Sequence, residues 1–229
     1  MALEQQIADL TTASNALTTE VVGKMGAIDA KVAAKELEVD NYLATARDEA
    51  PFFRMSKNQV LTGIGAVPDF WSAPAGVVLT RVFTVTTGTL WANRTLEEQA
   101  LLTAMGLADA VYIDGAFDVW RMSWTSNAPT AYTLHQYIPT SVALTIGAMV
   151  KLESGAINGF WAEGAIAGQW VNAGIHYALT NLRYANIHPM RMSAAGSMLF
   201  ALPAAVTGHV PLGQNKWGKF PYIGDAYAS

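Results

Sequence analysis

The chain has no cysteine and few charged residues. Because none of its 229 residues is a cysteine, the chain forms no disulfides and has no thiol chemistry. Only 14% of the residues are charged while 52% are hydrophobic, and soluble domains average about 25% charged residues. This scarcity indicates that much of the surface is covered, by oligomer contacts or by a larger assembly. Lysine and arginine form no cluster, so we expect no nucleic-acid partner.

Clean hydrophobic runs are also absent. Residues 122–150 and 192–215 contain no Asp, Glu, Lys or Arg, but prolines, histidines and amides interrupt both stretches. A membrane-spanning helix needs about 20 predominantly apolar residues, so we expect no membrane insertion. For residues 198–206 (MLFALPAAV) the sequence leaves open a loop that touches a membrane, and it favours a buried strand.

Proline and aromatic residues are nearly missing from the first fifty positions. This segment has no proline, two glycines and one aromatic residue, Tyr42, whereas residues 51–229 hold the other 22 aromatics and all nine prolines. The segment carries nine acidic and four basic residues, a net charge of −5 against +1 for the remainder. This shift in composition predicts a long helix over residues 1–50 and a separate β-rich domain over residues 51–229.

Apolar residues in the helical segment recur at steps of three and four, which predicts one narrow seam. Ser14 and Lys35 interrupt it. So narrow a seam buries too little surface for the helix to fold alone, so we predict that copies of the chain associate through it as a coiled coil. The alternative is an amphipathic helix that packs on its own globular domain. The predicted oligomerisation residues are Leu3, Ile7, Leu10, Leu17, Val21, Met25, Ile28, Val32 and Val39.

The seam contains one irregular step. Two steps of four follow one another, from Leu17 to Val21 and from Val21 to Met25. This additional step of four is a stutter, which locally unwinds a left-handed supercoil. Gly23 and Gly26 flank the stutter, which indicates a bend or break in the helix. The number of chains stays open, because β-branched residues at a positions with leucine at d favour a dimer, whereas Ile28 at a d position points to a larger oligomer.

The remaining residues show short alternating segments broken by glycine, proline and asparagine, which predicts a jelly-roll β-sandwich over residues 51–229. Residues 111–113 and 117–124 are expected to form a hairpin around Asp114 and Gly115. The other predicted strands are residues 77–87, 132–138, 142–152, 159–162, 170–171, 175–182 and 198–202.

One short helix is predicted inside this domain. Thr95 can accept a hydrogen bond from the amide of Glu98 while the Glu98 side chain reaches back, which is a capping box. Leu96, Leu101, Leu102 and Met105 are expected to form one apolar face of the helix, and Gly106 ends it. The predicted fold class is therefore mainly β, with an N-terminal α-helical coiled coil and a jelly-roll sandwich that carries one inserted helix.

Candidate catalytic and metal-binding residues are sparse. None of the four histidines has a His, Cys or Asp at metal-ligand spacing, so we expect no metal site and no cofactor. Asp109, Asp114 and Asp118 are the nearest approach to a glycosidase carboxylate pair. Asp114 already has a role in a turn and Asp118 lies in a strand, so we expect no enzyme activity.

Tryptophan is the residue type that best fits a ligand site. Sugar sites combine exposed aromatic faces with amide or carboxylate partners, because pyranose faces are apolar while their hydroxyls need hydrogen bonds. Four tryptophans have turn-like sequence contexts with such neighbours, and for each the alternative is packing in the core or against another subunit. These candidate ligand-binding residues are Trp71, Trp91, Trp161 and Trp217.

Three segments resemble known families. Residues 131–155 (AYTLHQYIPTSVALTIGAMVKLESG) resemble the central strand pair of galactose-binding-like jelly rolls, where a strand ending in Gln-x-Ile/Val-Pro precedes a turn and a second strand. Residues 115–125 (GAFDVWRMSWT) are similar to the strand before that pair. Residues 3–34 (LEQQIADLTTASNALTTEVVGKMGAIDAKVAA) are similar to the helical stems of tailed-bacteriophage fibre and tailspike proteins.

The resemblance implies a function for the whole chain. Phage fibres are usually homotrimers, and a stem followed by a carbohydrate-binding-like sandwich implies a tail fibre that binds host surface polysaccharide. The chain would then be made in the host cytoplasm and located in the virion. The alternative is a purely structural head, collar or baseplate fibre that bridges other virion structural proteins.

Overall fold

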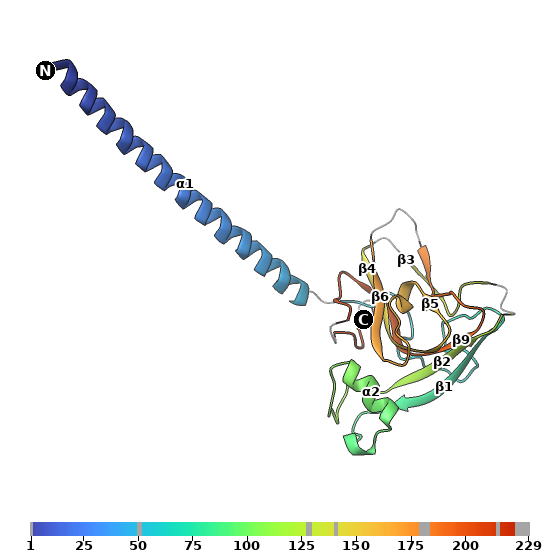
Figure 1. Ribbon diagram of the computed structural model, residues 1–229. Coiled ribbons are helices and arrows are strands. Elements are labelled where there is room, and N and C mark those ends of the chain that lie inside the picture. The colour runs from blue at the N-terminus through green and yellow to red at the C-terminus, as the bar shows by residue number, and fades with distance from the viewer. Residues whose placement is uncertain are drawn as a thin grey trace, which may run out of the picture. The chain divides into compact units, whose positions relative to one another are not determined.

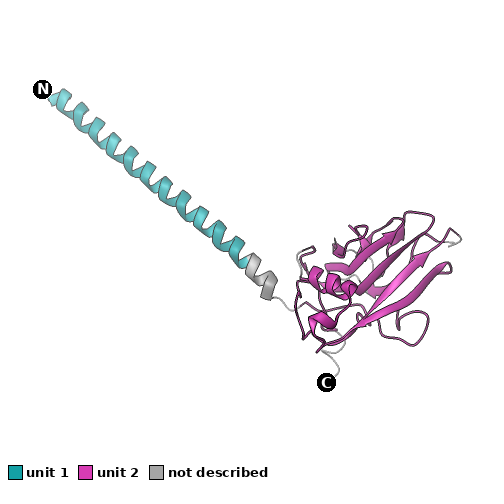
Figure 2. Ribbon diagram, turned by 60° about the horizontal axis from the view of Figure 1, so that its bottom comes forward, with its two compact units in different colours: residues 1–50 teal, residues 51–229 magenta. Residues whose placement is uncertain are grey.

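The computed structural model describes residues 2–49, 52–126, 130–139, 142–178, 184–213 and 216–222. The chain divides into two compact units, Met1–Ala50 and Pro51–Ser229, which Figure 2 shows in different colours. The first unit is a long helix and the second is built around a mostly antiparallel sheet, which confirms the coarse prediction of a mainly β protein with an N-terminal helix.

The first unit consists of helix α1, Ala2–Glu49 (Figure 1). Its 48 residues correspond to about 72 Å of length at about 1.5 Å per residue. The predicted break at Gly23 and Gly26 is wrong, because the helix continues through both residues. A glycine inside a helix costs about 1 kcal/mol relative to alanine, which a helix of this length tolerates.

The second unit contains a five-stranded antiparallel sheet with strand order β1-β2-β9-β4-β6. The central strand β9 pairs with β2 on one side and with β4 on the other. Strands that are far apart in sequence are therefore neighbours, so the sheet forms only when both ends of this unit are in place. The bounds are β1 Val77–Val85, β2 Phe117–Trp124, β4 Leu144–Ser154, β6 Val171–Tyr177 and β9 Gly196–Thr207.

Two short strand pairs and two 3-10 helices complete the unit. The pair β3–β7 joins Gln136–Pro139 to Tyr184–Ile187, and the pair β5–β8 joins Ile157–Asn158 to Met190–Arg191. The buried Ile138, Ile157 and Ile187 of these pairs belong to the same core as β2, β4 and β9 residues. The short pairs therefore cover one face of the five-stranded sheet. The 3-10 helices are η1, Trp91–Asn93, and η2, Phe160–Ala162.

Two hydrophobic cores lie on opposite faces of the main sheet. Successive side chains of a strand point to opposite faces, and β9 shows this directly: Met198 and Phe200 belong to the first core, whereas Leu199 and Ala201 belong to the second. Since β9 is buried on both faces, its long uncharged run is explained. The prediction of a buried strand over residues 198–206 is confirmed.

Strand β9 contains a bulge where its register with β4 shifts between Gly147 and Met149. Leu202 takes a left-handed conformation there, with φ of 53°. Its carbonyl accepts hydrogen bonds from the indole Nε1 of Trp217 at 2.9 Å and from Nε2 of Gln59 at 3.3 Å. Two distant side chains thus satisfy a backbone group that lies at the irregular point of the sheet.

Helix α2, Leu96–Ala104, begins with the predicted capping box. The Thr95 hydroxyl accepts from the Glu98 amide at 3.2 Å, and the Glu98 carboxylate accepts from the Thr95 amide at 3.0 Å. Leu101, Leu102 and Met105 are buried in the second core, as predicted. The placement of Leu96 on this buried face is wrong, because its side chain is 84% exposed at the start of the helix. The prediction of one short inserted helix is confirmed, and this helix covers the face of the main sheet opposite the short strand pairs.

Two predicted strands are wrong. Residues 111–113 form no strand, because β2 pairs with β1 and β9 instead of with them. The turn itself is present, since Gly115 has a φ of 66° and its amide donates to the Ile113 carbonyl. Residues 159–162 were expected as a strand and contain η2, which places Trp161 in the first core.

Candidate functional site

All nine predicted oligomerisation residues of α1 are exposed, from 47% for Val21 to 71% for Leu10. Two apolar residues outside the seam, Val22 and Leu37, are similarly exposed at 63% and 62%. Lys35, which interrupts the seam, pairs with Glu38 of the same helix at 2.5 Å. In the single chain the apolar residues of the seam are uncovered, like every other described side chain of α1. A row of uncovered apolar side chains is typical of an interaction surface.

Three of the four candidate tryptophans are buried. The exposed fractions are 5% for Trp71, 0% for Trp161 and 2% for Trp217. The indole of Trp71 donates to the Asn58 carbonyl, and that of Trp217 donates to the Leu202 carbonyl. The expectation of exposed indole faces is therefore wrong for these three residues: large aromatic side chains from turns fill the two cores.

The four tryptophans also fail to converge on one place. Trp71 and Trp161 meet edge to face in the first core, with ring centroids 6.4 Å apart. Trp217 belongs to the second core, and the partly buried Trp91 packs against that second core. Since the two cores lie on opposite faces of the main sheet, these residues share no site.

A different group of residues forms a continuous aromatic surface, which we call the ladder face. Its core consists of cross-strand pairs on the outer side of β3–β7 and the adjoining segments. Tyr137 lies opposite Asn186, and Tyr132 lies opposite Met190. Gln136 between them points inward and is buried. The ladder face comprises Tyr132, His135, Tyr137, Asn186, His188 and Met190.

The rings of the ladder face contact one another in sequence. His135 meets Tyr132 at 5.3 Å and Tyr137 at 6.4 Å between ring centroids, both nearly perpendicular. His188 lies 5.5 Å from Tyr132 and 5.2 Å from Phe160. Such edge-to-face and tilted contacts stabilise ring pairs and leave some ring faces open.

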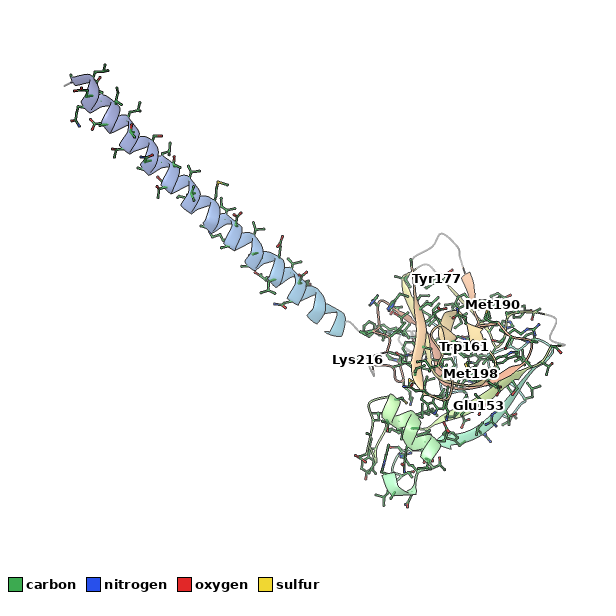
Figure 3. All side chains as sticks on the ribbon, viewed as in Figure 1. Glu153, Trp161, Tyr177, Met190, Met198 and Lys216 are labelled. Atoms are coloured by element: carbon green, nitrogen blue, oxygen red, sulfur yellow. The ribbon has the colours of Figure 1, made fainter. Side chains whose placement is uncertain are left out.

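The aromatic surface extends past the ladder face onto η2 and β6. Phe160 stacks on Tyr177 with centroids 6.2 Å apart. Figure 3 labels Tyr177, at the end of β6, and Met190, at the start of β8. Trp161, also labelled, is buried in the first core. Tyr137 is 64% exposed and Met190 is 36% exposed, whereas Tyr132, His135 and His188 between them are partly buried.

Hydrogen bonds hold the backbone beneath these rings. The Gln136 side chain donates to the carbonyls of Lys57 and Phe70, at 3.2 and 3.0 Å. The buried Thr133 hydroxyl donates to the Pro189 carbonyl at 2.9 Å. The Arg191 guanidinium donates to the Thr130 carbonyl at 2.9 Å. The ring-bearing segments are therefore fixed before any ligand arrives.

Two polar atoms of the ladder face lack partners among the described residues. Oδ1 of Asn186 and Nδ1 of His188 are buried and accept or donate no hydrogen bond. Burial lowers the pKa of His188 below its usual value near 6.5, and the nearby His135 adds to the effect. An unsatisfied buried polar group costs about 1–3 kcal/mol, so this surface has unused hydrogen-bonding capacity.

We expect acidification to destabilise the domain through His188. Because its folded pKa is lowered, the unfolded chain binds more protons below pH 6.5, so stability is complete above that pH and falls as the pH drops through it. His176, whose pKa is lowered by burial and by His209, acts with the same sign. Urea unfolding at pH 7.5 and 5.0 should show a smaller loss for His188→Asn than for the unchanged protein. Equal losses would contradict the assignment.

Two of the three aspartates considered for catalysis, Asp114 and Asp118, have structural contacts. Asp118 is 5% exposed, accepts from Thr84 at 2.5 Å and lies 3.6 Å from the Arg81 guanidinium. Asp114 lies 3.7 Å from Lys219 and its side chain is 88% exposed. Within the described part of the chain, no three His, Cys, Asp or Glu residues gather as a metal site.

The sequence did not predict the ladder face, although it did predict one of the strands that carry it. The alternation in residues 132–138 predicted a strand, and His135 and Tyr137 fall on its outer side. The partner strand β7 was not predicted, and it alone brings Asn186 and His188 beside them. The missing information was a long-range pairing, which alternation within one strand does not specify.

Two comparisons of the sequence with known proteins gave no match. No family model matches the chain, and no curated protein is detectably similar to it in sequence. Among the described residues, no helix is both long and apolar enough to cross a membrane.

Proposed function

We propose that the chain is a homo-oligomeric fibre of a tailed-bacteriophage virion, a tail fibre whose β domain binds host surface polysaccharide. The observation that carries the proposal is the seam of α1. It runs from Leu3 to Val39 with every apolar member exposed. An isolated helix in water gains its stability mainly by packing an apolar face, and identical seams on several copies supply that packing.

The favoured assembly is a parallel trimeric coiled coil, with a dimer as the alternative. Three helices side by side would place three β domains at one end, which multiplies weak contacts with a repetitive polysaccharide. The low charge content of the chain and the mostly antiparallel β domain agree with this proposal. The jelly-roll topology is part of the proposal, with the five-stranded sheet as one layer and the short pairs as the other.

A structural fibre that bridges other virion proteins is the second candidate. It is favoured by large apolar side chains on the surface of the β domain: Ile64 is 108%, Leu96 is 84% and Phe70 is 67% exposed. Such residues are covered in an assembled particle if the chain is a head, collar or baseplate component. The two candidates share the oligomeric stem and differ in what the β domain contacts.

Sedimentation equilibrium of the full chain tests the assembly. We expect a single species of three times the chain mass of 24.5 kDa at micromolar concentration. Adsorption of the fluorescently labelled protein to bacterial cells, with and without prior removal of surface polysaccharide, then separates a receptor-binding fibre from a bridging one. A monomer would overturn the proposal, and a trimer that ignores cells would favour the structural fibre.

A further inference from the structure

We propose that the ladder face binds a neutral saccharide, with hexose rings laid against Tyr137 and Tyr132 and hydroxyl groups bonded to Asn186. The inference rests on the proposed receptor-binding function and gives it a location. It replaces the tryptophan sites that the sequence suggested, because three of those four side chains are buried and the four share no site.

The chemistry of the ladder face matches a sugar on two counts. Pyranose rings have apolar C–H faces, which pack on aromatic faces, and Tyr137 offers a ring that is 64% exposed. Sugar hydroxyls need hydrogen-bond partners, and the Asn186 amide oxygen directly opposite Tyr137 is unpaired among the described residues. A sugar hydroxyl that donates a hydrogen bond to this oxygen removes the free-energy penalty of leaving it unsatisfied.

Access to Asn186 requires a side-chain movement. The amide oxygen is buried in the unliganded surface, and the exposed Tyr137 is its cross-strand neighbour. Exposed side chains change rotamer within picoseconds to nanoseconds, and such changes at a binding surface are common while the backbone stays in place. Access therefore requires that the Asn186 side chain turns outward, while the exposed Tyr137 ring stays in place against the hexose.

The charges around the ladder face favour an uncharged ligand. None of its six residues is Asp, Glu, Lys or Arg. Two charged side chains on neighbouring segments are engaged elsewhere: Arg191 donates to the Thr130 and Thr125 carbonyls, and Glu163 accepts from the Gly159 amide. The exposed Lys57 on the adjoining segment places its Nζ 5.1 Å from the centre of the Phe70 ring. Since the ladder face itself carries no lysine, arginine or carboxylate, we assign the ligand class as neutral hexose or 6-deoxyhexose chains.

The rings of the ladder face contact one another in succession rather than around an enclosed pocket. Successive contacts connect Tyr137, His135, Tyr132, His188 and Phe160, and Phe160 stacks on Tyr177. A line of rings suits several consecutive units of a polymer better than a single monosaccharide, for which an enclosed pocket is typical. We therefore expect affinity to rise with oligosaccharide length.

Binding of the full chain to an array of purified bacterial O-antigen and capsular polysaccharides tests the inference. We expect the unchanged protein to bind at least one neutral polysaccharide, and Tyr137→Ala and Asn186→Ala to weaken that binding roughly tenfold each. Tyr112→Ala is the matched control, because Tyr112 is 81% exposed and lies outside the ladder face. It should bind like the unchanged protein.

Each other outcome has a definite reading. Equal binding by Tyr137→Ala and Tyr112→Ala, an array without signal, or binding confined to acidic polysaccharides would each overturn the inference. Sedimentation of the same samples separates this failure from failure of the proposed assembly, since a trimer that binds no polysaccharide retains the stem. Circular dichroism of Tyr137→Ala must match the unchanged protein, and Tyr137→Phe, which keeps the ring, should retain binding.

Discussion

We expect the double substitution Leu10→Asp and Leu17→Asp to convert the oligomer into monomers. Burying a leucine contributes about 1.5–3 kcal/mol per chain, and both side chains are exposed in the single chain, at 71% and 63%. Aspartates placed at these positions would face one another across the seam. Their carboxylates would lose hydration without gaining an ion-pair or hydrogen-bond partner, which further disfavours association. Sedimentation equilibrium measures the change directly, and the helical signal in circular dichroism should fall with it.

The control for this experiment lies on the same helix. Val22→Asp and Leu37→Asp together make the same change in charge at two apolar residues of 63% and 62% exposure, but both positions lie outside the seam. We expect this variant to remain an oligomer with the mass of the unchanged protein. If both double variants become monomeric, the seam does not define the interface, and if neither does, α1 does not hold the chains together.

The organisation of the chain follows from local features of the sequence. The change in composition near residue 50 coincides with the boundary between the compact units. The capping box at Thr95 and Glu98 identifies α2, because both hydrogen bonds form within four residues. Residues 117–124, predicted as a strand after the turn at Asp114 and Gly115, form β2 with the same bounds. In each case the determining contacts are near in sequence or depend only on a repeated pattern.

The pairing of the strands was beyond this kind of reasoning. Residues 111–113 and 117–124 have the pattern of a hairpin, yet β2 pairs with β9, some eighty residues away. The choice depends on which partner buries more apolar surface, and β9 offers residues for both cores. The same limit explains the tryptophans: a turn-like context describes the backbone around Trp161, whereas its burial depends on residues such as Phe200, 5.3 Å away.

We expect Trp217→Ala to produce the largest loss of stability among single substitutions in the β domain considered in these experiments. The indole is 2% exposed, meets Phe220 at 5.0 Å between centroids and lies so close to Gly147 that a Cβ there would be 3.0 Å from the ring. Replacing a buried tryptophan by alanine costs about 3–5 kcal/mol, through lost transfer free energy and the cavity left behind. Urea unfolding followed by tryptophan fluorescence measures the free energy.

Two further variants separate the contribution of the Trp217 hydrogen bond to stability from that of the buried ring. Trp217→Phe keeps most of the ring but removes the hydrogen bond to Leu202, whose carbonyl still accepts from Gln59, so we expect a loss of only about 1 kcal/mol from that bond. Trp91→Ala removes the same side chain at a partly exposed site of the second core, and its cost should be smaller than that of Trp217→Ala. If Trp217→Ala costs no more than Trp91→Ala, the segment around Trp217 contributes little to the second core, and the absence of a side chain at Gly147 must have another cause.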